Sequence, residues 1–209
     1  TVLDVGHAPG SLQAPLVAMG RYILISENDR LNSTRLRILD TQPKEERPTP
    51  VGEARIDGQT REAAVVRGKQ LFVPAGDERI AAFTVSEGDP QKVLNAVAAF
   101  QSPKPQGGRM FLATGPDDQF WMASSSLRKF KLMTDRIAPD KESMSLGVSS
   151  QPVQTIGNSL FVGRRALFSR AVFFTSVDRE KMTGQWQAVT GGRILECTGP
   201  SPPDGSIVC

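Results

Sequence analysis

The segment Gly20-Arg21-Tyr22-Ile23-Leu24-Ile25 decides the fold, because its outline returns four more times along the chain of 209 residues. Each copy consists of a glycine, a basic or amide residue, a variable residue and then an apolar run. One glycine before apolar residues is common in any β protein, but five copies at similar intervals indicate an internal repeat. The five copies begin at Gly20, Gly68, Gly108, Gly157 and Gly192.

The spacing of the copies is that of a β-propeller blade. The glycines are separated by 48, 40, 49 and 35 residues, and a blade of four strands takes about 40 to 50 residues. Each glycine is expected to supply a turn between two strands, and the apolar run after it is an inner strand covered on both faces. Further strand-like segments lie at residues 15–18, 36–39, 63–66, 80–85 and 171–175.

The repeat therefore predicts an all-β fold, a β-propeller of four-stranded antiparallel blades with about four to five blades in this chain. A two-sheet sandwich and an irregular barrel are the alternatives, since short strands with turn signals also describe them. Residues 89–100 begin with Asp-Pro and have an apolar spacing compatible with a helix, but the blade spacing predicts strands there. We expect a single propeller domain over residues 1–209, with repeats at 12–60, 61–100, 101–150, 151–188 and an incomplete 189–209.

The last repeat is too short to make a full blade. A ring of typically four to eight blades closes a propeller, and an open array leaves unpaired edge strands and apolar faces at its ends. We therefore expect this chain to be part of a larger propeller. The remaining blades would lie elsewhere in the protein, or a second copy would supply them in a homodimer.

The composition indicates a soluble protein rich in turns. Hydrophobic residues make up 39% and charged residues 22%, with 19 glycines and 15 prolines. The net charge of +3 comes from 25 basic and 22 acidic residues scattered along the chain, which argues against a nucleic-acid partner. No apolar run reaches the length of about 18 residues needed for a membrane span, and no signal segment is visible in this chain.

The two cysteines, Cys197 and Cys209, flank the turn-rich stretch 198–205. If that stretch doubles back as a hairpin, the two sulfur atoms come within bonding range. A disulfide would indicate an oxidising compartment, which is the periplasm, the cell envelope or the extracellular space. Two unpaired thiols in neighbouring strands are the open alternative.

The segment from Asp178 to Trp186 resembles the repeat signature of the quinoprotein (PQQ-like) family. In that signature an Asp after the third strand leads through a Thr-Gly turn to a Trp in the fourth strand. The residues that carry the resemblance are Asp178, Thr183, Gly184 and Trp186, and the spacing from Asp to Thr is longer than in the family. The repeat at residues 36–41 begins in the same way and then departs from the signature.

The resemblance implies structural roles. In the family the Trp of each blade packs between sheets and the Thr-Gly turn fixes the hairpin, so we expect Trp186 to be a core residue. Trp121 is expected in the core on its own apolar context. Members that oxidise alcohols or sugars hold a quinone with calcium and acidic residues, and some have a vicinal cysteine pair, which is absent here. The resemblance therefore points to the non-catalytic branch, which includes the lipoprotein of the bacterial outer-membrane assembly machinery, and implies no cofactor.

The sequence offers few other groups for catalysis or metal binding. His7 is the only histidine, and together with two cysteines it gives no metal site of the His and Cys type. The serine run 124–126 lacks the strand-to-helix turn of a nucleophilic serine. The glycine pairs at 107–108 and 191–192 precede apolar strands rather than helices, unlike phosphate-binding loops. We expect no catalytic, cofactor-binding or metal-binding residue.

Three polar segments can carry a function but have simpler explanations. Asp77-Glu78 and Asp117-Asp118 are paired carboxylates that can bind a cation or act on a sugar, and we expect them to solvate blade turns instead. Residues 163–170 contain three arginines with Leu167 and Phe168, a composition that suits a protein-binding loop. A charged connection between two strands is the simpler expectation.

Two function classes remain. The first is a non-catalytic interaction module, secreted or in the cell envelope, that presents its loops to a protein or polysaccharide partner. The second is an enzyme, a quinoprotein-like oxidoreductase or a propeller hydrolase, with part of its active site outside this chain. The absence of a catalytic set in the sequence favours the first class.

Overall fold

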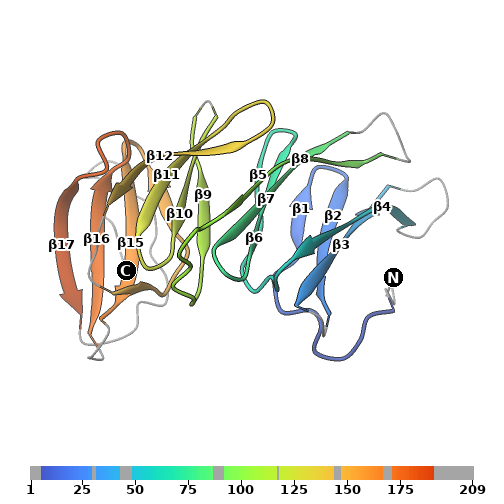
Figure 1. Ribbon diagram of the computed structural model, residues 1–209, viewed down its shortest axis with the longest axis horizontal. Coiled ribbons are helices and arrows are strands. Elements are labelled where there is room, and N and C mark those ends of the chain that lie inside the picture. The colour runs from blue at the N-terminus through green and yellow to red at the C-terminus, as the bar shows by residue number, and fades with distance from the viewer. Residues whose placement is uncertain are drawn as a thin grey trace. The chain divides into compact units, whose positions relative to one another are not determined.

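The computed structural model describes residues 6–29, 32–42, 49–86, 92–116, 118–143, 147–166 and 171–190. These residues form seventeen strands and no helix. The strands make four antiparallel sheets that follow one another along the chain (Figure 1). We call these sheets blades 1 to 4. The all-β prediction with four-stranded antiparallel sheets is confirmed.

The blades contain mostly four strands each. Blade 1 consists of β1 (Val17–Met19), β2 (Tyr22–Asn28), β3 (Ser33–Asp40) and β4 (Thr49–Asp57). Blade 2 consists of β5 (Val65–Arg67), β6 (Gln70–Ala75), β7 (Arg79–Val85) and β8 (Leu94–Gln101). Blade 3 consists of β9 (Phe111–Thr114), β10 (Gln119–Ala123), β11 (Leu127–Leu132) and β12 (Ile137–Ser143). Blade 4 consists of β13 (Val148–Ser149), β14 (Gln154–Ile156), β15 (Ser159–Arg165), β16 (Val172–Asp178) and β17 (Gly184–Thr190).

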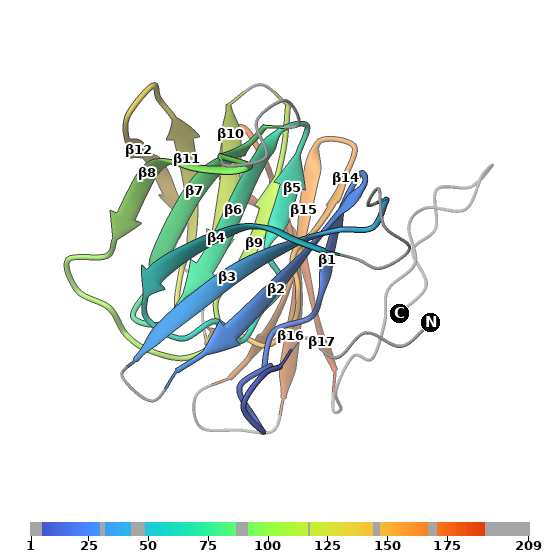
Figure 2. The ribbon, with the colours of Figure 1, turned by 90° about the vertical axis from the view of Figure 1, so that its right-hand side faces the viewer.

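Blade 4 has five strands because both β13 and β14 pair with β15. The strand β8 confirms the strand prediction for the second part of residues 89–100, while residues 87–91 lie outside the described residues. Figure 2 shows the twist of blade 1, in which the outer strand β4 is rotated relative to β1. Such a twist is the ordinary consequence of backbone sterics in L-residues.

The chain divides into two compact units. Unit 1 comprises Thr1–Met110 and Leu132–Ala138, and it contains blades 1 and 2. Unit 2 comprises Phe111–Lys131 and Pro139–Cys209, and it contains blade 4 and most of blade 3. Each unit has its own hydrophobic core.

In unit 1, apolar side chains of blades 1 and 2 pack against each other. Phe72 is also fully buried, between Leu71 and Val73 on the same strand, so both faces of β6 are covered. Each such side chain contributes about 1.5–3 kcal/mol on burial. The residues at the centre of this core are Leu24, Leu36 and Ile38 of blade 1 and Leu71, Val73 and Phe83 of blade 2.

In unit 2, Trp121 of blade 3 lies in the core and is 0% exposed, as predicted. It packs with Leu127 of the same blade and with Leu160 and Val162 of blade 4. Gly115 makes room for the indole, because a Cβ atom at that position would lie 2.3 Å from the Trp121 ring. A larger residue at position 115 would therefore displace the largest side chain of this core.

The repeat glycines do not all occupy the same place in their blades. Gly20, Gly68 and Gly157 lie between the first and second strands of the repeat, with φ of 61°, 56° and 56°. These positive φ values favour glycine. Gly108 instead precedes β9, the first strand of blade 3, so the prediction that it supplies the same turn is wrong. Gly192 lies outside the described residues.

A buried polar network ties blade 1 to the chain segment that leads to blade 2. The Thr34 hydroxyl oxygen lies 2.7 Å from Asn28 Oδ1 and 2.8 Å from the Gly58 carbonyl oxygen. The backbone N–H of Thr60 donates to Asn28 Oδ1 at 2.8 Å, and Asn28 Nδ2 donates to the Thr60 carbonyl at 2.7 Å. Thr34 and Thr60 are 0% exposed, so every group of this network depends on its partners instead of water.

We predict that Thr34→Val destabilises the protein by about 1–3 kcal/mol, because it leaves buried polar groups of the network unsatisfied while keeping the side-chain volume. Thr84→Val, at a half-buried position of β7, is the matched control and is expected to change stability by less than about 0.5 kcal/mol. Urea denaturation followed by circular dichroism measures both. Equal stability of the two variants would show that the network does not stabilise the fold.

Candidate functional site

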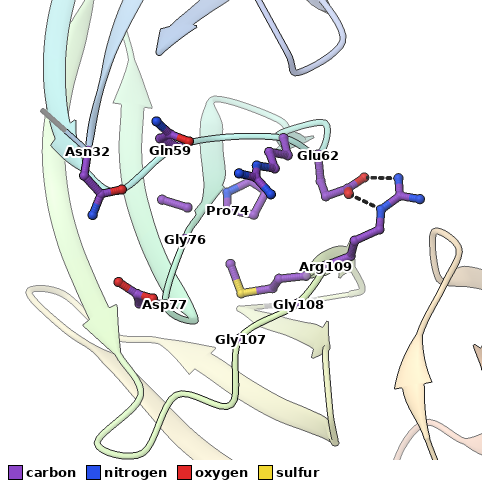
Figure 3. Close-up of a pocket in the computed structure, with 12 residues that line it drawn as sticks. Asn32, Gln59, Glu62, Pro74, Gly76, Asp77, Gly107, Gly108 and Arg109 are labelled. Carbon is purple, nitrogen blue, oxygen red and sulfur yellow. Dashed lines mark hydrogen bonds and ion pairs between the residues drawn. The ribbon is translucent and has the colours of Figure 1, made fainter. Parts of the chain in front are cut away.

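A pocket of about 310 Å³ opens in unit 1, where the connections between several strands come together (Figure 3). Asn32 comes from the connection between β2 and β3, and Asp77 comes from the turn between β6 and β7. The other lining residues belong to the β4–β5 connection, to the end of β6 and to the segment before β9. They are Gln59, Arg61, Glu62, Pro74, Ala75, Gly76, Gly107, Gly108, Arg109 and Met110.

The β4–β5 connection is held in place by close backbone contact. The N–H of Gly58 donates to the Asn32 carbonyl at 2.7 Å, and the N–H of Gly76 donates to the Gln59 carbonyl at 2.9 Å. Gly58 has φ of 87°, and a Cβ atom on it would lie 3.1 Å from the backbone of Gly76. A side chain at position 58 would push these two backbones apart. Together with the Thr34 network, this contact fixes the segment that carries Gln59 and Arg61.

An ion pair joins two walls of the pocket. Arg109 Nε lies 2.5 Å from Glu62 Oε1, and Arg109 Nη2 lies 2.9 Å from Glu62 Oε2 (Figure 3). This two-point hydrogen bond with the Glu62 carboxylate raises the pKa of Arg109. The Glu62 side chain is 11% exposed and that of Arg109 is 52% exposed. The pair therefore holds the segment before β9 against the β4–β5 connection.

Backbone strain gathers at this pocket. Among the described residues, four non-glycine residues have positive φ, and three of them are Asn32 (57°), Asp77 (61°) and Glu78 (51°). Asn32 and Asp77 line the pocket, and Glu78 follows Asp77 in the same turn. The left-handed conformation costs an L-residue about 1–2 kcal/mol, less for Asn and Asp. Strain of this kind persists where the surrounding structure imposes it, often at functional sites.

Three polar side chains of the lining take no part in holding the fold together. Within the part of the chain that the structure describes, the side chains of Asn32, Arg61 and Asp77 make no hydrogen bond and no ion pair. Arg61 and Asp77 are exposed. A guanidinium, a carboxylate and an amide are thus available to a ligand in one pocket.

Sequence reasoning found only fragments of this site. Asp77 and Glu78 do not act as a pair of carboxylates, because Asp77 is exposed whereas Glu78 is 3% exposed. The sequence predicts Gly108 as a repeat glycine and gives no role to Arg109, and in the structure both residues form a wall of the pocket. Arg61 and Asn32 belong to no sequence motif, so nothing in the sequence was a reason to place them in a site.

The residues from Asp178 to Trp186, on which the resemblance to the quinoprotein repeat rests, lie in unit 2. Asp178 Oδ1 accepts hydrogen bonds from the N–H groups of Lys181 at 2.8 Å and Glu180 at 2.9 Å, and these bonds lower the pKa of Asp178. The N–H of Asp178 donates to the Thr183 carbonyl at 2.9 Å, which closes the turn before Gly184 at the start of β17. These hydrogen bonds hold the turn between β16 and β17.

The prediction that Trp186 is a core residue is wrong, because its side chain is partly exposed in the part of the chain that the structure describes. Trp186 is 47% exposed. Its ring centroid lies 6.0 Å from that of Phe161 and 5.9 Å from that of Phe174. Phe161 and Phe174 form a cluster separate from the core around Trp121, so the burial of Trp186 would require a further neighbour on that face of blade 4.

The arginine-rich segment 163–170 is partly used by the fold. Arg164 is 2% exposed, and its Nη1 donates to the carbonyl oxygens of Gly147 at 3.3 Å and Ser124 at 3.4 Å. Burial lowers the pKa of Arg164 to about 10. This buried side chain holds two connections of unit 2 together, while residues 167–170 lie outside the described residues.

The remaining candidates are distributed over both units. His7 is exposed, and its Nδ1 lies 3.0 Å from the carbonyl oxygen of Ala8. Within the described ranges, no group of three His, Cys, Asp or Glu side chains is arranged to hold a metal ion, and no helix long and apolar enough to cross a membrane was found. Asp117, Cys197 and Cys209 lie outside the described residues.

Comparison with known proteins identifies the fold. No protein-family model and no curated protein matches the sequence. The structure is similar to BamB from Moraxella catarrhalis, with a TM-score of 0.54 and 10% identity over 84% of this chain and 61% of that one. It is also similar to Sqt1 from Saccharomyces cerevisiae, with a TM-score of 0.64 and 11% identity over 85% of this chain and 48% of that one.

Both of these proteins are β-propellers, and at such low identity the likeness concerns the fold alone. This chain therefore has the β-propeller fold. It spans 61% of the length of BamB and 48% of the length of Sqt1.

We predict that Asp77→Gly raises the free energy of unfolding by about 0.5–1 kcal/mol, because glycine adopts positive φ without strain. The greater conformational entropy of glycine in the unfolded chain offsets only part of this stabilisation. Asp135→Gly is the control, since Asp135 has no positive φ, and it is expected to lower stability. Urea denaturation followed by circular dichroism compares the two. A loss of stability in both variants would mean that the turn at Asp77 is not strained.

Proposed function

We propose that this chain is a non-catalytic interaction module, and that the pocket of unit 1 binds a segment of a partner protein. The observation that carries the proposal is that Asn32, Arg61 and Asp77 line one pocket while their polar side-chain groups make no hydrogen bond or ion pair among the described residues. Native proteins satisfy most of their polar groups internally or with water. Two strained residues with free side chains in one pocket are best explained by recognition.

The lining favours a protein partner over a polysaccharide. None of the twelve lining residues is aromatic, whereas a sugar ring is usually held by packing its apolar C–H face on an aromatic ring. The available groups are instead a guanidinium, a carboxylate and an amide, which suit the charged side chains and backbone amides of a peptide segment.

The pocket is less suited to acid–base catalysis. A general base, most often a histidine or a carboxylate, needs an unoccupied nitrogen or oxygen within hydrogen-bond reach of the proton that it removes. The Glu62 carboxylate is already bound at both oxygens by Arg109, and Asp77 is exposed to water. A quinoprotein-like oxidoreductase remains the competing function, and it predicts a shifted absorption band when the quinone and calcium are added together.

Three broader features belong to this proposal. The segment from Asp178 to Trp186 supports kinship with the non-catalytic branch of the quinoprotein repeat family. A disulfide between Cys197 and Cys209 would support a location in the cell envelope or outside the cell. The repeat pattern supports a larger propeller, in which further blades or a second copy complete the ring.

A displayed library of random peptides tests the function. We predict that peptides selected on the wild-type chain bind the variant Arg61→Gln with Asp77→Asn at least about tenfold more weakly, a loss of about 1.4 kcal/mol or more. Both replacements keep polar side chains, and Asn tolerates the positive φ at position 77. Fluorescence polarisation with labelled synthetic peptides gives the affinities.

The matched control is the variant Lys69→Gln with Asp57→Asn. Both residues are exposed in unit 1, outside the pocket, and the control makes the same change in charge. It is expected to bind the selected peptides as the wild type does. Equal binding by all three proteins, or binding of polysaccharides without any peptide, would contradict the proposed function.

A further inference from the structure

The charges of the pocket specify the partner more closely. Four lining side chains are charged, and two of them, Glu62 and Arg109, neutralise each other through two hydrogen bonds. Arg61 and Asp77 are left without a counter-charge among the described residues. The pocket therefore has no net charge but presents one positive and one negative group separately.

A ligand of a single charge sign fits this arrangement badly. An acidic segment is attracted by Arg61 and repelled by Asp77. A basic segment is attracted by Asp77 and repelled by Arg61. A segment with one acidic and one basic side chain gains at both groups. Opposed charges thus select the partner by repelling the wrong one as well as by attracting the right one.

Part of the pocket wall carries no side chain. Gly107 and Gly108 have φ of 69° and 96° and carry no side chain, and Gly76 lies on the pocket lining as well. Asn32 supplies a side-chain amide that can donate to and accept from a peptide bond. The volume of about 310 Å³ is at the lower end for ligand pockets, about 300–1,000 Å³, so the site holds a short stretch.

We propose that the pocket recognises a short segment of a partner protein that carries both an acidic and a basic side chain, the acid bound by Arg61 and the base by Asp77. This inference rests on the proposed function, because it names the chemistry of the partner that the same pocket binds. Both contacts lie in an exposed site, so their strength falls as salt rises.

A double-mutant cycle between protein and peptide tests the inference. A synthetic peptide from the library selection is made with its acidic residue replaced by the corresponding amide, and in a second version with its basic residue replaced by Gln. Each peptide is measured against the wild type, Arg61→Gln and Asp77→Asn by fluorescence polarisation. The variants' circular dichroism spectra and unfolding midpoints verify that each is folded.

We expect that removing the peptide's acid weakens binding to the wild type at least fivefold but has no effect on Arg61→Gln. Removing the base should weaken binding to the wild type and have no effect on Asp77→Asn. Such coupling shows that the two groups contact each other, since independent sites give additive losses. Raising the salt from 50 to 500 mM should weaken the complex of the wild type with the unchanged peptide. The same change in salt should have almost no effect on the weaker binding of that peptide to the variant Arg61→Gln with Asp77→Asn.

Three other outcomes overturn the inference in different ways. If peptides bind in a manner that depends on the pocket but all losses are additive, the charge recognition is wrong and the interaction function stands. If no peptide binds in a pocket-dependent manner, the proposed function fails and the inference fails with it. Selected peptides with charges of a single sign also overturn the inference.

Discussion

The burial of both faces of the inner strands is the constraint on which this structure depends. Leu71, Phe72 and Val73 of β6 are consecutive and all fully or almost fully buried, although successive side chains of a strand point to opposite faces. A single sheet cannot cover both faces of its own strand. Each blade is therefore stable only against another blade, and the connections between blades must be held firmly enough to keep the faces together.

The candidate site follows from this constraint. The chain passes from blade 1 to blade 2 through Gly58 and Thr60, whose backbone groups are bound by Asn28 and Thr34. Since the buried network already satisfies that backbone, neighbouring side chains such as Arg61 are not needed to hold the connection. The same rigid segment that positions two sheets thus presents unused polar groups at its surface, which is how a structural scaffold acquires a binding site.

The sequence predicted the features that depend on local pattern. Strand segments, antiparallel sheets and the burial of Trp121 follow from apolar runs between turns. The position of Gly108 could not be predicted. A glycine followed by apolar residues has the same sequence pattern whether it precedes the first or the second strand of a blade. The exposure of Trp186 depends on what lies against one face of blade 4, which no local pattern encodes. The pocket joins four distant segments, so only the fold reveals it.

The contrast between the two tryptophans gives the molecule an intrinsic optical label. Trp121 is 0% exposed and Trp186 is 47% exposed, and they are the only two tryptophans of the chain. An indole in an apolar core emits at shorter wavelength and is shielded from dissolved quenchers, whereas an exposed indole emits further to the red. The fluorescence therefore has two components, and the red one reports on the face of blade 4 formed with Phe161 and Phe174. Whatever covers that face shifts this component to the blue without any dye attached to the protein.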